Sequence, residues 1–204
     1  MMTLLLAIAD DPKSAMRLLA KEPALATATL EAGATRQQAK PYFLDAIAHH
    51  VYTGDTALHV AAAAHSVVLI RRLVRLGADV HATNRRGHTP LHYATRGGPG
   101  SPSWNPRAQA AAIAALIAAG ADPNAVDDNG STPLHRAVRN RCAAAVRALL
   151  DGGADPRRKN GGGSTAKQLA TMTTGKGGSG TAAAKVAQAE ILRLLGHISS
   201  ATSK

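Results

Sequence analysis

Apolar residues in the middle of the chain recur in short groups that have the spacing of a helix face. Each group follows a shorter apolar group, such as Leu58, Ala61 and Ala62, from which a few residues separate it. The longer groups are Val67, Ile70, Leu73 and Val74, then Ile113, Leu116 and Ile117, then Val146, Leu149 and Leu150. This pattern predicts pairs of short helices that recur along the chain and pack through their apolar faces.

A short string of letters opens each of these segments, and a second string closes it. The opening strings are Thr56-Ala57-Leu58-His59, Thr89-Pro90-Leu91-His92 and Thr132-Pro133-Leu134-His135, and the closing string Gly-Ala-Asp stands at 77–79, 120–122 and 153–155. Threonine at a helix start accepts hydrogen bonds from free backbone N–H groups, and proline fits the first helical position because its missing donor costs nothing there. Glycine after the second helix adopts a backbone conformation that other residues tolerate poorly. We therefore expect the leucines to point inward and the histidines to bridge neighbouring turns.

Thr-Pro-Leu-His-x-Ala at a spacing near 33 residues resembles the ankyrin repeat. The resemblance implies one all-α domain over residues 1–204, an ankyrin-repeat solenoid of about five stacked helix-turn-helix units. Each unit of such an array contacts only its neighbours, and the end units depart from the pattern because one of their faces meets water. The expected full repeats are 53–85, 86–128 and 129–161, with a degenerate unit and connecting segment at 1–52 and a degenerate repeat at 162–204.

The spacing of the threonines predicts loop insertions in alternate repeats. Thr56 to Thr89 and Thr132 to Thr165 are both 33 residues, whereas Thr89 to Thr132 is 43. The excess falls between the two helices of its unit, at about Gly97 to Pro106. A glycine-rich stretch at 175–180 marks a second insertion, of ten or about twelve residues depending on whether Gly196 closes the last helix. Two interpretations are open: the insertions are drifting surface loops, or they fold back on neighbouring units to form one thickened edge with Trp104 largely buried.

The two ends of the chain lack the repeat letters. Residues 3–9 and 14–21 predict a helix-turn-helix around Pro12, and we interpret the apolar start as a buried helix because a signal peptide would begin with basic residues. Between 27 and 52, the pattern suggests that one helical turn ends at 31–33 and another starts at 43–48, with Phe43 packed against the first full repeat. In the last unit, Lys167 and Gln168 replace the leucine and the histidine of the repeat, which suits a cap that faces solvent.

Composition adds little that restricts function. The single cysteine excludes an intrachain disulfide, and no apolar run approaches the ~20 residues that span a bilayer. We expect a cytoplasmic monomer with no membrane attachment and no cofactor.

The residues that carry chemistry are better explained by the repeat than by a catalytic or metal site. His59, His92 and His135 are letters of the repeat, and the other histidines show no metal-ligand spacing, so we predict no metal site and no catalytic residue. The glycine-rich stretch 175–180 lacks the order of a phosphate-binding loop and no strand precedes it. Cys142 lies near a helix start beside Arg139 and Arg141, a setting that lowers a thiol pKa. We nevertheless interpret it as a small packing residue, because the repeat places no histidine base beside it.

Charge is the remaining signal. Residues 1–55 hold five Lys and Arg against six Asp and Glu, a net charge of −1, whereas residues 56–204 hold nineteen against seven, a net charge of +12. In the family that this chain resembles, the variable positions that line the concave face are the finger tips and the exposed end of each first helix. On this chain they are Tyr52, Thr53, Asp55, Ala63 and Ala64, then Arg85, Arg86, His88 and Arg96, then Asp128, Asn129, Ser131, Arg139 and Asn140.

We therefore expect a non-enzymatic protein-binding module whose concave face and finger loops bind an acidic protein surface through arginines. The alternative is a module that binds nucleic acid or a phosphorylated ligand, which the basic balance permits and the scarcity of aromatic residues weakens. A solvated basic surface without a single partner is the third interpretation.

Overall fold

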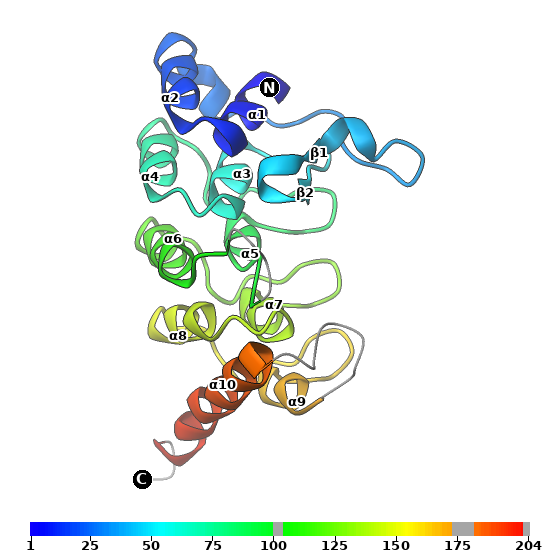
Figure 1. Cartoon of the computed structure of the whole chain (residues 1–204), viewed down its shortest axis with the longest axis vertical. Coiled ribbons are helices and arrows are strands. Elements are labelled where there is room, and N and C mark those ends of the chain that lie inside the picture. The colour runs from blue at the N-terminus through cyan, green and yellow to red at the C-terminus, as the bar shows by residue number, and fades with distance from the viewer. Residues whose placement is uncertain (100–103, 173–181, 202–204) are drawn as a thin grey trace.

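In the computed structural model, helices that follow one another in sequence pair and stack into an elongated body (Figure 1). The structure describes residues 1–99, 104–172 and 182–201, with residues 197–201 described by their backbone. The pairs are α1 (Met2–Asp10) with α2 (Pro12–Lys21), α3 (Ala57–Ala63) with α4 (Val67–Arg75), α5 (Pro90–Ala94) with α6 (Pro106–Ala118), α7 (Pro133–Arg139) with α8 (Ala143–Asp151), and α9 (Ala166–Thr171) with α10 (Ala182–Ala201). Odd-numbered helices form one layer and even-numbered helices the other, and the loops between pairs project beyond the odd-numbered layer. The predicted helix pairs, including the first, are confirmed.

Each repeat histidine joins two units. The ring Nδ1 of His92 accepts a hydrogen bond from the backbone N–H of Thr89 (3.2 Å), and its Nε2 lies 3.0 Å from the carbonyl oxygen of Ser131 in the next unit. These partners assign the hydrogen to Nε2, which donates to that carbonyl. His59 and His135 make the same pair of contacts. The structural role predicted for these histidines is confirmed.

Glycine ends the second helix of each full unit, as predicted. Gly77, Gly120 and Gly153 have φ values of 88°, 99° and 91°, a left-handed conformation that strains a residue with a Cβ atom.

Small side chains let the helices stack closely. Leu58, Leu91 and Leu134 are almost completely buried, together with alanines of the first helices such as Ala61 and Ala94. In the second helices, Ile70, Leu73, Ile113, Leu116, Val146 and Leu149 are buried, whereas Val67, Val74, Ile117 and Leu150 are half-buried. The buried Leu69, which the helical spacing did not single out, completes the inner face of α4.

The prediction of helical turns within residues 27–52 is confirmed in part: residues 31–33 form no helical turn, whereas a 3-10 turn lies within the predicted 43–48. The structure has 3-10 turns, at Pro23–Ala26, Lys40–Tyr42 and Asp45–Ile47, and a two-stranded antiparallel hairpin in which β1 (Phe43–Leu44) pairs with β2 (His49–His50). Adjacent residues of a strand face opposite sides, so Leu44 enters the core while the ring of Phe43 lies tilted against that of His50, with 4.6 Å between the ring centroids. Phe43 therefore does not pack against the first full repeat as predicted.

The first insertion is anchored through Trp104. Its indole Nε1 donates to Oε1 of Gln109 (2.9 Å), and the buried Gln109 side chain donates in turn to the carbonyl oxygens of Ala94 and Arg96. The ring also packs over Gly97. Trp104 is partly buried and also packs against the hydrophobic core, so the prediction of a docked and largely buried indole is confirmed in part.

The second insertion, at 175–180, lies outside the described residues, so the thickened edge remains a prediction. Gly196 lies inside α10 and does not close the helix. No helix in the described ranges combines the length and apolar character needed to cross a membrane.

Candidate functional site

The turns between helix pairs form a continuous strip along one side of the stack. Backbone hydrogen bonds join each turn to the next, from Arg85 N to Thr53 O (2.9 Å), from Asp128 N to Arg86 O (3.1 Å) and from Gly161 N to Asn129 O (2.9 Å). We use the name finger surface for the exposed part of this strip around Tyr52, Arg85, Arg86, Asp128 and Asn129. Its residues come from successive repeats, so the spacing of the stack fixes their positions relative to one another.

A polar residue, buried in the first two of these turns and partly buried in the third, holds each turn in shape. In every case the side-chain Oδ1 accepts hydrogen bonds from the backbone N–H groups two and four residues later, at distances of 2.9 to 3.1 Å. These residues are Asn84, Asp127 and Asn160. Our sequence analysis missed them, although their spacings of 43 and 33 residues match those of the repeat threonines.

Asp55, a predicted partner-binding residue, belongs to the interior. Its side chain is fully buried and accepts hydrogen bonds from Tyr93 Oη (2.7 Å), Asn84 Nδ2 (2.8 Å) and the backbone N–H of Tyr52 (2.7 Å). Burial raises the pKa of this carboxyl and also raises the pKa of Tyr93. Asp55 therefore ties the first finger to the next unit and is not available to a partner.

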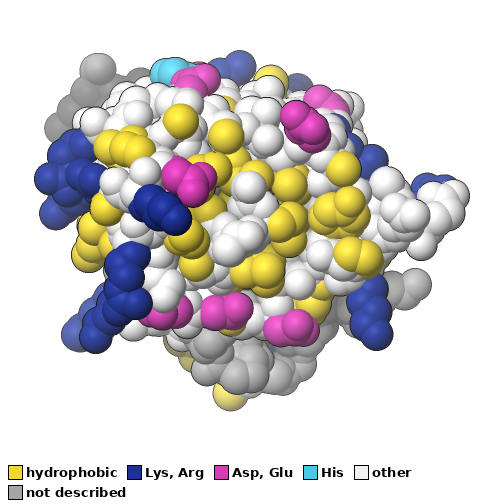
Figure 2. All heavy atoms as spheres, turned by 90° about the horizontal axis from the view of Figure 1, so that it is seen from above, with side chains coloured by type: hydrophobic (Ala, Val, Ile, Leu, Met, Phe, Trp, Pro, Cys, Tyr) yellow, Lys and Arg dark blue, Asp and Glu magenta, His cyan; other side chains and the backbone are white. Residues whose placement is uncertain are grey.

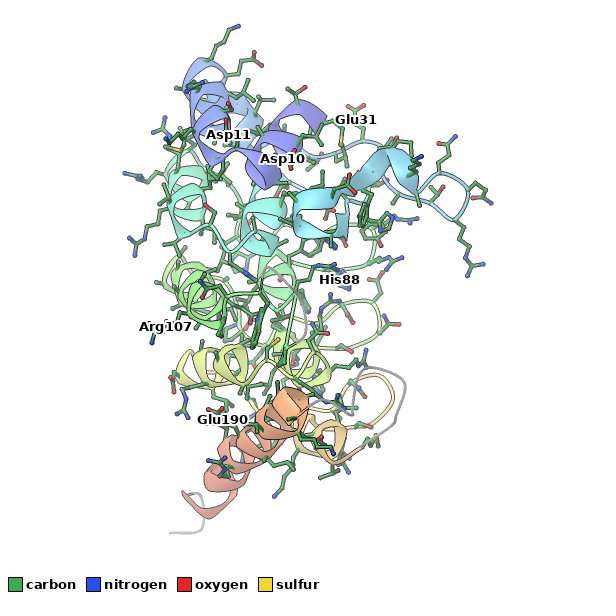
Figure 3. The ribbon with its side chains drawn as sticks, viewed as in Figure 1. Asp10, Asp11, Glu31, His88, Arg107 and Glu190 are labelled. Atoms are coloured by element: carbon green, nitrogen blue, oxygen red, sulfur yellow. The ribbon has the colours of Figure 1, made fainter. Side chains whose placement is uncertain are left out.

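His88 is also structural. Its Nε2 accepts a hydrogen bond from Arg136 Nη1 (2.8 Å), and Asp127 Oδ2 lies 3.3 Å from the same nitrogen. Burial and the charge of Arg136 lower the pKa of His88 to about 3, so the ring is neutral at pH 7 and its contact with Asp127 is not an ion pair. In Figure 3, His88 lies on the finger side of the stack, whereas Arg107 projects from the opposite side.

Two further predicted residues serve mainly to join units. Ser131 is 3% exposed and its carbonyl oxygen accepts the hydrogen bond of His92, so its assignment to the binding surface is wrong. Asn140 is exposed, but its Nδ2 donates to the carbonyl oxygen of Thr95 in the preceding unit (2.9 Å). Of the alanines that we placed on this face, Ala63 is buried and Ala64 is half-buried.

The accessible part of the predicted site is largely arginine. Arg85 and Arg86 are exposed and lie against the ring of Tyr52, with their guanidinium carbons 5.3 and 4.1 Å from its centroid. Arg96 is half-buried and donates to the carbonyl oxygen of Ala48 (2.5 Å), which joins the hairpin to α5. Arg139 is exposed at the end of α7, together with Asp128 and Asn129 at the finger tip.

Acidic side chains do not neutralise these arginines. Within the described residues, the ion pairs of arginine are Arg147 with Glu190 (3.7 Å) and Arg157 with Asp155 (3.5 Å), and neither involves the finger surface. Asp10, Asp11 and Glu31 lie at the N-terminal end of the stack, and Glu190 lies on α10 (Figure 3). Seen from that N-terminal end, acidic side chains are scattered among hydrophobic ones, while Lys and Arg lie mostly around the rim (Figure 2). Arg85 and Arg86 of the finger surface therefore form no ion pair within the described residues, although the surface also includes the exposed Asp128.

The side chains that a catalytic or metal site would require lie away from the finger surface or are buried. Cys142 is fully buried and donates to the carbonyl oxygen of Gly97 (2.6 Å), and burial raises the pKa of its thiol to about 12. A thiol with this pKa is protonated at pH 7, which supports a packing role over a reactive one. In the part of the chain that the structure describes, no three His, Cys, Asp or Glu side chains gather to hold a metal ion.

Comparison with known families agrees with the geometry. The family model for ankyrin repeats in many copies matches residues 44–94 and 116–170, and the model for the single ankyrin repeat matches residues 86–128. The matched ranges together run from β1 to α9 and include every helix pair with the full repeat letters. No curated protein matches the chain.

Proposed function

Because the chain belongs to the ankyrin-repeat family, whose members are generally protein–protein interaction modules and typically not enzymes, we propose that its finger surface binds an acidic region of a partner protein. The proposed binding module is a solenoid of five helix-pair units, of which the first and the last are degenerate. The binding residues are Tyr52, Arg85, Arg86, Asp128 and Asn129 at the finger tips, with Arg96, Arg139 and Asn140 beside them on the concave side.

One observation carries the proposal: Arg85 and Arg86 are exposed, ordered on Tyr52 and unpaired with any carboxylate of the described residues. An arginine that is already held in place loses less conformational entropy when it binds. Its planar guanidinium donates two parallel hydrogen bonds to a carboxylate, so Asp or Glu side chains of a partner would satisfy it.

A nucleic acid is the less supported ligand. Binding to single strands generally uses aromatic rings as platforms for the bases, and Arg86 already covers the ring of Tyr52. The net charge of +12 over residues 56–204 attracts phosphates to any basic part of the protein. A test must therefore distinguish the effect of net charge from the effect of an arginine at the finger surface.

Charge reversal at matched sites makes that separation. We expect Arg86→Glu to weaken binding to a partner captured from the source cell about tenfold or more. Arg193→Glu, at an exposed position of α10, changes the net charge equally and is expected to have less than about a twofold effect. Affinity is measured for the purified pair at several salt concentrations.

Equal and large losses for both variants, with a steep salt dependence, would identify a nucleic acid as the ligand. Equal and small losses would contradict the proposal and favour a solvated basic surface.

A further inference from the structure

The first finger, the finger of the next unit and the loop at 34–39 line an open polar cavity of about 640 Å³. It lies beside the loop before β1, which projects furthest from the stack in Figure 1. Three of its lining residues are arginines, Arg36, Arg85 and Arg86, and none is acidic. Tyr52 and His50 complete the wall from the strand side. A cavity of this size accommodates a side chain or a small ligand.

The arginines lie at different points of the wall. The loop that carries Arg36 is closed by hydrogen bonds between Thr35 and Gln38, from Gln38 N to Thr35 Oγ1 (3.0 Å) and from Thr35 N to Gln38 O (3.2 Å). Arg85 donates one Nη2 hydrogen bond to the carbonyl oxygen of Ala34 (2.6 Å). Arg86 lies over Tyr52, and within the described residues its guanidinium forms no ion pair. Each guanidinium has five N–H donors, so most of those around the cavity are free.

The number and arrangement of these donors distinguish between anions. A carboxylate carries one negative charge and its two oxygens lie in one plane, which matches a single guanidinium. A phosphoryl group carries a charge of about −1.5 to −2 at pH 7 and has three strong acceptor oxygens pointing in different directions. Three arginines from two loops around one cavity therefore fit a phosphoryl group better than a carboxylate.

We propose that this cavity binds a phosphorylated side chain of the partner protein. This inference rests on the proposed function, because it assumes that the finger surface binds a partner protein and that this protein carries the phosphoryl group. It adds that phosphorylation of the partner strengthens the complex through Arg36, a residue that our sequence analysis did not place in the site.

Three peptides test the proposal, each with the same Asp-containing sequence and a central phosphoserine, glutamate or serine. We expect the full chain to bind the phosphoserine peptide about tenfold more tightly than the serine peptide, with the glutamate peptide in between. Arg36→Gln removes an exposed guanidinium from a loop and is expected to reduce the phosphoserine preference to less than about threefold. Arg193→Gln, the matched control, should retain the full preference.

Each outcome bears on a different part of the proposal. Equal binding of the three peptides by the unaltered chain would overturn the phosphoryl site while leaving the acidic-partner function standing. A phosphoserine preference that survives Arg36→Gln would place the anion elsewhere and would also overturn the site. Absence of binding to all three would contradict both proposals. Arg36-dependent retention on phosphoinositide vesicles, without a peptide preference, would show that the ligand belongs to a membrane and not to a protein.

Discussion

Leu91→Ala is expected to lower the free energy of unfolding by about 2–5 kcal/mol. Leu91 is completely buried in α5, a five-residue helix that packs against α3 before it and α7 after it. Removal of the isobutyl group leaves a cavity that the neighbouring helices fill incompletely, because each is also held by its own unit. The loss is measured by urea denaturation followed by circular dichroism.

Leu6→Ala is the matched control. It deletes the same atoms from a helix in which the side chain is 43% exposed, so we expect a loss of less than about 1 kcal/mol. Similar losses for the two variants would contradict the assignment of the core.

Acidification from pH 7 to pH 4 is expected to destabilise the protein by several kcal/mol, on the order of 3 kcal/mol for His92 alone. Burial lowers the pKa of His92 to about 4 and that of His49 to about 2, whereas an unfolded histidine titrates near 6.5. Between pH 6.5 and pH 4, the unfolded chain therefore binds protons that the folded chain does not, and stability falls as pH falls. Asp55 opposes part of this loss, because its raised pKa lets the folded chain take up a proton before the unfolded chain does.

His92→Gln tests the origin of the acid effect. Glutamine occupies the same position in the last unit, where Gln168 Oε1 accepts a hydrogen bond from the backbone N–H of Thr165 (2.8 Å). The variant keeps this helix cap without a group that titrates, so its stability should change less between pH 7 and pH 4 than that of the unaltered chain. An unchanged pH dependence would show that His92 does not contribute to the effect.

The repeat frame could be predicted from sequence because its signals are local. A threonine cap, the histidine three residues later and a closing glycine act within one helix pair, so their spacing alone places the helices. The segment 27–52 has no such letters. Its conformation is fixed by contacts to the following units, such as Arg96 to Ala48 in the hairpin turn and Leu30 N to Asp55 O before the hairpin, which no local pattern records.

The errors in the candidate site have a common physical cause. Asp55, His88 and Ser131 occupy the position before the repeat threonine, at the end of a finger, where a polar residue looks available to a partner. In the folded chain, the next helix or finger covers this position, and the polar atoms of each residue bond across the boundary between units. Arg85 and Arg86 lie further out on the finger and remain exposed, so only exposure in the stack separates these candidate binding residues from the residues that hold the fingers.

Selection of peptides from a random displayed library tests most directly whether the finger surface recognises acidic protein segments. We expect peptides retained by the unaltered chain to be enriched in Asp and Glu, and to bind Arg193→Glu but not Arg86→Glu. Peptides without acidic enrichment, or acidic peptides that bind both variants equally well, would contradict this expectation.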